Sequence, residues 1–167
     1  MKRTLAATAI VTVLALGPAA AIAAAPQKIH ADGVGQVKLG MTFKQLRDKH
    51  LVGKLRKGCE LAGPNARTAR LRSPLRGTVN FTQSAPRKVT DITITGGAEA
   101  RGVGIGDRLS DIKAKFAKRK VDHSQEGTFG LTFVFVPKKS NPKLMFAIDV
   151  NTKKITAIGV PIIAVCE

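Results

Sequence analysis

The chain has neither tryptophan nor tyrosine, and its seven phenylalanines are the only aromatic residues among 167. Proteins that read single-stranded nucleic acids stack the bases on aromatic side chains carried by their strands. No predicted strand of this chain offers such a platform. We therefore expect no specific nucleic-acid readout, and any nucleic acid would be held through its phosphates.

Acidic residues are also scarce, with 11 Asp and Glu against 28 Lys and Arg. A positive charge of this size attracts polyanions such as nucleic acids, anionic glycans, teichoic-acid-like polymers and membrane headgroups. The alternative is that the charge only keeps the protein soluble. Charge alone says nothing about the fold.

Catalytic motifs are missing as well. The sequence contains no G-x-S-x-G nucleophile turn, no phosphate-binding loop, no G-x-G-x-x-G fingerprint and no H-x-x-x-H metal spacing. We expect no enzyme, no catalytic residue, no cofactor and no metal site. A hydrolase with an unrecognised site stays open as a minor alternative.

The N-terminus has the pattern of a signal peptide, predicted to span residues 1–25. Lys2 and Arg3 precede an apolar stretch from Leu5 to Leu16, and small residues suited to signal peptidase follow. The apolar stretch is too short for a permanent transmembrane helix, although an N-terminal anchor is the alternative. We expect a secreted or periplasmic, cell-envelope protein with no transmembrane segment in the mature chain. Its 26 basic and 11 acidic residues leave a formal charge of +15.

Only two cysteines are present, Cys59 and Cys166. In an exported chain, two cysteines favour one disulfide over a metal site. The bridge would close a loop of about 100 residues, worth roughly 4 to 5 kcal/mol in the chain-entropy model. Two free thiols are the alternative.

An internal repeat is the strongest positive signal. At an offset of 66 residues, "VKLGMTFKQLRDKH" (37–50) aligns with "VGIGDRLSDIKAKF" (103–116), and "KVTDI" (88–92) aligns with "KITAI" (154–158). Two matches in one register indicate a duplicated unit of about 65 residues. The two copies are predicted to span residues 32–98 and 99–167.

Each copy opens with apolar residues spaced along one face of a helix. This spacing is shared by two sets of residues: Leu39, Phe43, Leu46 and His50 in the first copy, and Ile105, Leu109, Ile112 and Phe116 in the second. Thr42 followed by Gln45 fits a capping box, whereas Asp107 is the predicted cap of the second helix.

Each helix is followed by segments that alternate apolar and polar residues or are rich in β-branched residues, for example "GTVNFT" and "LTFVFVP". These segments predict antiparallel strands. One helix plus three or four strands, twice over, predicts an α+β protein. In this fold, two tandem copies of a helix followed by antiparallel strands would place both helices on one face of the sheet.

The motif Gly40-Met41-Thr42 with Gln45 and Leu46, in a duplicated unit, resembles the β-lactamase-inhibitor-protein-like fold. It also resembles the SmpA/OmlA family of outer-membrane-assembly lipoproteins. The resemblance covers most of residues 32–165 and implies a concave sheet face used for binding. The aromatic binding surface, acidic loop, intra-copy disulfides and lipid-anchor cysteine of these families are missing here, so only the fold is carried over.

Basic residues are the candidate binding residues, and they form two groups. The first group occupies alternate positions of an extended segment, which would place the side chains on one face, and contains Arg70, Arg72 and Arg76. The second group surrounds the end of the second helix and contains Lys113, Lys115, Lys118, Arg119 and Lys120. A solvated surface is the alternative interpretation. The leading hypothesis is a non-enzymatic binding module for an anionic polymer or envelope surface. The second is an inhibitor or assembly factor that docks another exported protein on its sheet face.

Overall fold

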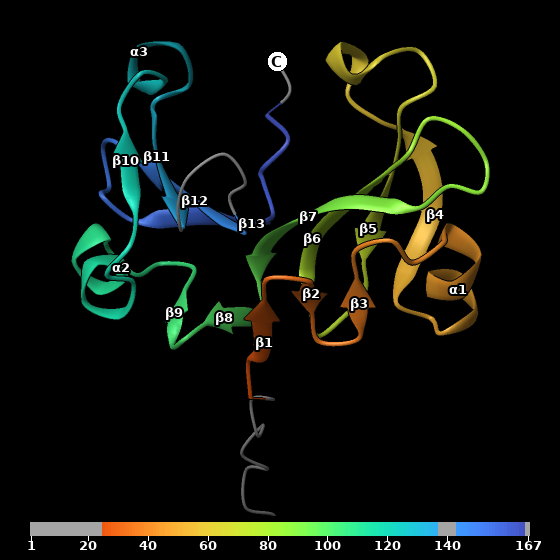
Figure 1. Cartoon of the computed structure of the whole chain (residues 1–167), viewed down its shortest axis with the longest axis horizontal. Coiled ribbons are helices and arrows are strands. Elements are labelled where there is room, and N and C mark those ends of the chain that lie inside the picture. Colours follow the sequence, from red (N-terminus) through yellow and green to blue (C-terminus); the bar gives the residue numbers. More distant parts are fainter. Residues whose placement is uncertain (1–24, 137–142, 166–167) are drawn as a thin grey trace, which may run out of the picture.

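The computed structural model describes residues 25–136 and 143–165 (Figure 1). Almost all of the predicted signal peptide lies outside these residues, and so does Cys166. The leader and the Cys59–Cys166 disulfide therefore remain predictions. Within the described part of the chain, no helix has the length and apolar character needed to cross a membrane.

The main element of the fold is an eight-stranded sheet in which every neighbouring pair is antiparallel. Its order is β10-β11-β12-β13-β7-β6-β5-β4. The strands are β4 (Val52–Lys57), β5 (Arg67–Leu71), β6 (Arg76–Phe81), β7 (Val89–Gly96), β10 (Lys120–Asp122), β11 (Leu131–Val136), β12 (Leu144–Asp149) and β13 (Ile155–Val160). The last strands of the two copies, β7 and β13, pair at its centre, so one sheet spans both copies.

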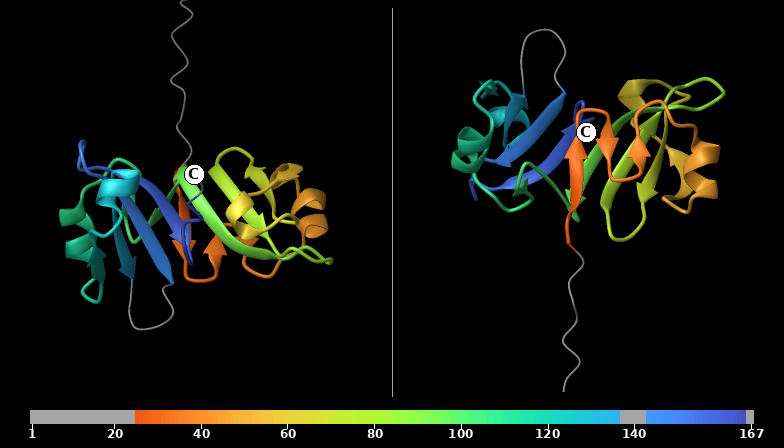
Figure 2. Two further views of the ribbon diagram at one scale, coloured as in Figure 1. Left: turned by 90° about the horizontal axis from the view of Figure 1, so that it is seen from above. Right: turned by 60° about the horizontal axis from the view of Figure 1, so that its bottom comes forward.

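A second sheet of five short strands runs along one side of the large sheet, with β8 and β9 beside the second copy and β2 and β3 beside the first (Figures 1 and 2). Its order is β3-β2-β1-β8-β9, and β1 pairs with β8 in parallel. The strands are β1 (Gln27–His30), β2 (Gly33–Val34), β3 (Val37–Lys38), β8 (Ala98–Ala100) and β9 (Val103–Gly104). The helices are α1 (Phe43–Asp48), α2 (Leu109–Lys115) and α3 (Glu126–Phe129), with a 3-10 turn η1 (Glu60–Ala62).

The 66-residue offset recurs in the backbone contacts of the two copies. An isolated β-bridge joins the start of each helix to the residue just before the last strand of its copy: Thr42 pairs with Lys88, and Arg108 pairs with Lys154. Both partners in the second bridge are displaced by the same 66 residues. The two bridges therefore keep the 66-residue register of the sequence.

The two sheets share one hydrophobic core. Val34, Val37 and Val103 of the small sheet and Ile92 and Ile158 of the large sheet are all fully buried in one cluster. Burial of such aliphatic side chains is the main favourable term in folding. The small sheet therefore packs against one face of the large sheet, and we call the opposite face the outer face.

The prediction of an α+β protein with helices packed on the sheet is wrong. Among the residues that the structure describes, strands hold 47% and helices 15%, so this part of the chain is mostly β. Helices α1 and α2 have only six and seven residues, and each buries a single side chain, Leu46 or Ile112. The helical spacing runs past the helices, because Leu39 lies before the α1 cap and His50 is exposed beyond its end with φ 56°.

The predicted cap of the second helix is also wrong by one residue. The N-cap is Arg108, whose backbone N–H donates to Asp111 Oδ2 at 2.8 Å. Thr42 N donates to Gln45 Oε1 at the same distance in the first copy. Asp107 instead accepts a hydrogen bond from a β9 backbone N–H. The cap keeps the 66-residue register, and the apparent shift arose because aspartate is the commoner capping residue.

Candidate anion-binding site

The outer face of β5, β6 and β7 is built by the alternation of side chains along each strand. Ala69 and Val79 are buried on the core side, whereas Arg70 and Thr78, one residue away on each strand, pair across the outer face. Thr78 pairs in turn with Thr93 of β7. A row of polar side chains therefore crosses this half of the sheet.

Strands β4, β5 and β6 contain six basic residues and no carboxylate: Lys54, Arg56, Lys57, Arg67, Arg70 and Arg76. Two of them already have local partners. Lys57 Nζ lies 2.6 Å from Glu60 Oε1, and Arg67 Nη1 donates to the Ala66 carbonyl at 2.8 Å. Arg70 and Arg76 make no side-chain hydrogen bond or ion pair with any residue in 25–136 or 143–165.

Arg70 and Arg76 line one pocket of about 600 Å³, together with Ser73, Thr78 and Thr95. Guanidinium groups bind carboxylate, phosphate and sulfate oxygens through paired N–H donors, and hydroxyl groups add further donors. The set therefore suits an anion with several oxygens. We call this cavity the Arg70–Arg76 pocket.

A β-bulge and two glycines position Arg76. The register of β6 on β7 shifts between Arg76 and Gly77, and Gly77 adopts φ 140°, which suits glycine alone. Arg76 pairs with Gly96, where an added Cβ would come within 2.4 Å of the Arg76 Nε atom. The guanidinium group therefore lies over Gly96, in space that a larger residue would fill.

The predicted trio of arginines is split by the hairpin between β5 and β6. Arg72 is exposed in the turn, where its carbonyl accepts from Leu75 N at 3.1 Å, and it does not line the pocket. Residues at alternate positions share a face only while the chain stays extended. The turn after Leu71 interrupts it, and Arg76 returns to the same pocket as Arg70 from the neighbouring strand.

The predicted lysine-rich group also separates into different roles. Lys113 and Lys115 are exposed on α2, and Lys120 is exposed at the start of β10. Lys118 lines a separate cavity. Arg119 Nη1 donates to the Phe116 carbonyl at 2.8 Å and so satisfies an acceptor at the C-terminal end of α2.

The two basic groups do not form one surface. Four strands separate β6 from β10 in the sheet order, which puts the strands roughly 24 Å apart at the usual spacing. The distance exceeds the Debye length of about 8 to 10 Å at physiological salt. An anion held by the arginines is therefore screened from most of the lysines.

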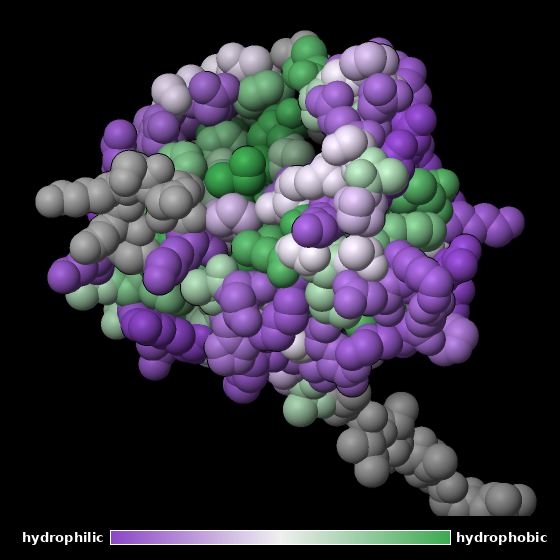
Figure 3. Space-filling view, turned by 45° about the vertical axis from the view of Figure 1, so that its right-hand side comes forward, coloured by the Kyte–Doolittle hydropathy of each residue, from purple (hydrophilic) through white to green (hydrophobic). Residues whose placement is uncertain are grey.

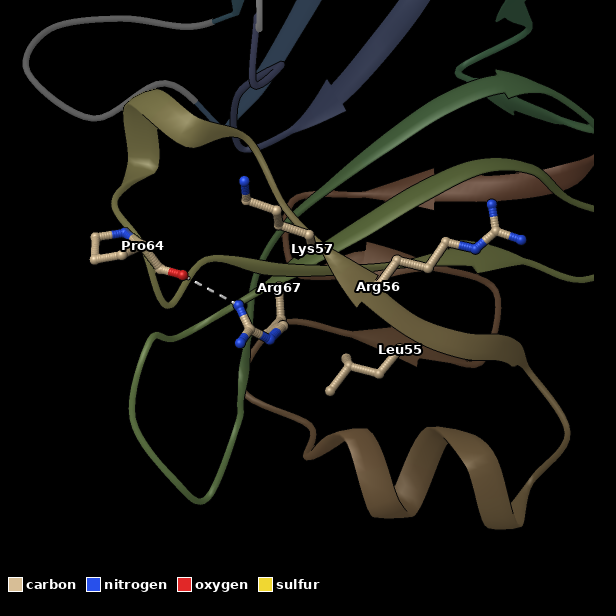
Figure 4. A pocket seen from close by; sticks show the side chains of 5 residues that line it. All are labelled: Leu55, Arg56, Lys57, Pro64 and Arg67. Atoms are coloured by element: carbon tan, nitrogen blue, oxygen red, sulfur yellow. Dashed lines mark hydrogen bonds between the residues drawn. The ribbon is translucent and has the colours of Figure 1, made fainter.

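A smaller pocket of about 390 Å³ lies at the β4 edge of the sheet, lined by Leu55, Arg56, Lys57, Pro64 and Arg67 (Figure 4). Arg67 Nη1 donates to the Pro64 carbonyl at 3.3 Å across it. Because Arg67 and Lys57 are held by local partners, this pocket offers fewer open donors than the Arg70–Arg76 pocket.

Asp91 is a buried carboxyl group on β7 that sequence reasoning missed. It accepts hydrogen bonds from Asn80 Nδ2 at 2.7 Å and from Thr90 Oγ1 at 2.9 Å. Burial raises the pKa of Asp91 above its usual range, although both hydrogen bonds act in the opposite direction. The only signal in the sequence was an aspartate within a predicted strand, between Thr90 and Ile92.

Asp91→Asn should make the protein more stable than the wild type at pH 7. The raised pKa means that the folded state binds the Asp91 proton more tightly than the unfolded state does. The protonated carboxyl group therefore stabilises the fold below the unfolded-state pKa, and this contribution is lost as pH rises through the folded-state pKa. Urea unfolding of both proteins between pH 3 and 7 should show the two curves diverging as pH rises. Asp149→Asn is the control of opposite sign, because hydrogen bonds from Thr152 lower the pKa of Asp149. A constant offset between wild type and Asp91→Asn would contradict the prediction.

The other half of the outer face is apolar. Phe133, Met145 and Ala147 form a buried cluster across β11 and β12, against which Ile163 and Val165 of the C-terminal segment pack. On the upper side of the molecule, hydrophobic residues lie at the bottom of a hollow with a hydrophilic rim (Figure 3). The outer face thus changes from polar to apolar between its two halves.

Comparisons with protein-family models, with curated proteins and with solved structures found no match to this chain. The resemblance to the β-lactamase-inhibitor-protein-like fold and to the SmpA/OmlA family therefore stays a prediction from the sequence.

Proposed function

We propose that the protein is an exported, non-enzymatic binding module that holds an anionic polymer of the cell envelope. The Arg70–Arg76 pocket is its principal contact with the polymer. Oxygen atoms of phosphate, sulfate or carboxylate groups on the polymer would accept hydrogen bonds donated by the two guanidinium groups. The hydroxyl groups of Ser73, Thr78 and Thr95 would complete the contact.

One observation carries the proposal: two arginines without a partner in the described residues share a pocket with three hydroxyl side chains. Two like charges beside one cavity gain nothing from each other, and an exposed arginine contributes little to stability. A bound anion would neutralise both charges, and none of the strands β4, β5 and β6 supplies a carboxylate to do so.

Heparin is the probe for this site, and its binding should weaken steeply with salt. Each neutralised charge releases counterions, so affinity falls as a power of the salt concentration. With several contacts, we expect a loss of about a hundredfold or more between roughly 50 and 200 mM salt. Titration calorimetry at four salt concentrations would give the slope.

The double variant Arg70→Gln/Arg76→Gln should bind heparin about ten- to a hundredfold more weakly at low salt. Its slope of log affinity against log salt should be shallower by about 1 to 2. Thermal stability should change little, because both side chains are exposed and unpaired within the described chain.

Lys113→Gln/Lys115→Gln is the matched control, since it also removes two exposed positive charges, but from α2. It should keep most of the affinity of the wild type. An equal loss in both double variants would mean that the charge acts diffusely, and the Arg70–Arg76 pocket would then be no site.

The second candidate function is docking of another exported protein on the outer face, as an inhibitor or assembly factor. The cluster of Phe133, Met145 and Ala147 is already buried under Ile163 and Val165, so the apolar surface that a partner could contact here is that of Ile162, which is 42% exposed in the same C-terminal segment. Binding to one envelope protein that persists at high salt, with heparin binding absent, would support this function over the first.

A further inference from the structure

A third and larger cavity, of about 830 Å³, lies between the small sheet and the second copy. Residues of β1 and β8 line one side, and the end of α2 with the facing ends of β11 and β12 lines the other. Its apolar lining comes from Ile29, Ala100, Phe116, Val136 and Leu144. The volume is within the range of cavities that enclose small organic ligands.

Cationic side chains surround this apolar lining. Lys28 and Glu99 both line the cavity and form an ion pair with each other. Arg101, Lys118 and Lys143 also line it and have no carboxylate partner among the residues described. The cavity therefore combines an apolar wall with three positive charges that no acid of its lining neutralises.

Arg101 occupies a backbone conformation that L-residues rarely adopt, with φ 53°. The equivalent position of the first copy, 66 residues earlier, is Gly35 with the same φ of 53°. The guanidinium carbon of Arg101 lies 5.3 Å from the centroid of the Phe116 ring, and Arg101 Nη1 donates to the Lys115 carbonyl at 3.4 Å. The second copy thus places a fixed cation where the first copy has a glycine that suits the turn.

Other lining residues differ from their counterparts in the same way. Phe116 stands where the first copy has the exposed His50, and Lys118 stands where it has the buried Val52. The positions that hold the repeat together, such as the bridges at Thr42 and Arg108, keep their geometry. The copies therefore differ in the side chains that build this cavity. In the second copy, these side chains lie opposite the β1 residues that also line it.

We infer that this cavity binds a single-chain anionic amphiphile as a monomer. The alkyl chain would lie against Phe116, Val136 and Leu144, where its burial removes apolar surface from water. The anionic head would lie near Arg101, Lys118 and Lys143 and accept hydrogen bonds from them. This site is separate from the Arg70–Arg76 pocket, and no residue lines both.

Calorimetric titration with decyl sulfate, below its critical micelle concentration, tests the inference. The wild type should bind one molecule per chain. Decanol, which has the chain without the charge, and inorganic sulfate, which has the charge without the chain, should each bind at least about tenfold more weakly. Equal binding of decanol, or of inorganic sulfate, would overturn the inference.

Three variants locate the binding. Arg101→Gly should lose about tenfold or more in affinity without a lower melting temperature, because glycine adopts φ 53° freely. Lys118→Gln should weaken binding, whereas Lys113→Gln, an exposed lysine on α2 outside the cavity, should not. Ala117→Trp, at an exposed lining position, should block the cavity.

Unchanged binding in Arg101→Gly or Ala117→Trp would place the amphiphile elsewhere and overturn the inference, as would an equal effect of Lys113→Gln and Lys118→Gln. Heparin binding should be unaltered in Arg101→Gly. This readout separates the two sites, so the amphiphile site and the polymer site can fail independently.

Discussion

Leu46→Ala and Ile112→Ala are each expected to lower the free energy of unfolding by about 2 to 5 kcal/mol. Both side chains are fully buried in the shared core, and each is the only buried residue of its helix. Truncation leaves a cavity and removes the contact that holds a six- or seven-residue helix against the rest of the protein. Because the two positions are 66 residues apart in the repeat, the two losses should be of similar size. Urea unfolding at neutral pH measures both.

Leu61→Ala is the matched control for this pair of variants. Leu61 has 76% of its surface exposed in η1, so the same substitution should cost less than about 1 kcal/mol. A neutral result for Leu46→Ala or Ile112→Ala would mean that the helix concerned does not pack on the core.

Gly77→Ala is expected to lower the free energy of unfolding by about 2 to 6 kcal/mol, from backbone strain and overpacking together. Gly77 adopts φ 140°, and an added Cβ would lie 1.9 Å from the Thr93 carbonyl oxygen. The contact is with backbone of the neighbouring strand, so no side-chain movement relieves it. The substitution would disturb the bulge that positions Arg76, and heparin binding should weaken in any folded fraction.

Gly53→Ala provides the comparison for Gly77→Ala within the same sheet. Its added Cβ would meet the Arg70 carbonyl oxygen at 3.8 Å, an ordinary contact, and Gly53 is not among the residues with positive φ. The change should stay within about 1 kcal/mol of the wild type. Similar stability for the two variants would contradict the bulge at Gly77.

The candidate site was only partly predictable. Alternation in an extended segment predicted Arg70, Arg72 and Arg76 together, but the period of two holds only along one strand, and Arg76 joins Arg70 through the pairing of β6 with β5. It could not exclude Arg72, because the position of the turn after Leu71 depends on where β5 and β6 pair. The role of Arg119 as a partner of α2 carbonyls was hidden for a similar reason, since its side chain folds back on a helix that ends earlier than its apolar spacing suggests.

Periodicity within each copy did not fix the fold class. The spacing of Leu39, Phe43, Leu46 and His50 fits a helix of three turns, but the helix covers only Phe43–Asp48. Gly40, with φ 80°, turns the chain before the capping box, and Thr42 and Lys88 form a bridge at the helix start. Contacts between distant residues override local helical preference here, which made a mostly β protein read as α+β.

By itself, the sequence determined the repeat, its 66-residue register, the capping box at Thr42 and the buried positions Leu46 and Ile112. These features depend on spacings of a few residues or on direct comparison of the two copies. Only the tertiary structure decided that β7 pairs with β13, that a second sheet covers the core, and that Arg101 and Lys143 face one cavity. The physical reason is that strand pairing joins residues far apart in the chain, and no local pattern states which strand meets which.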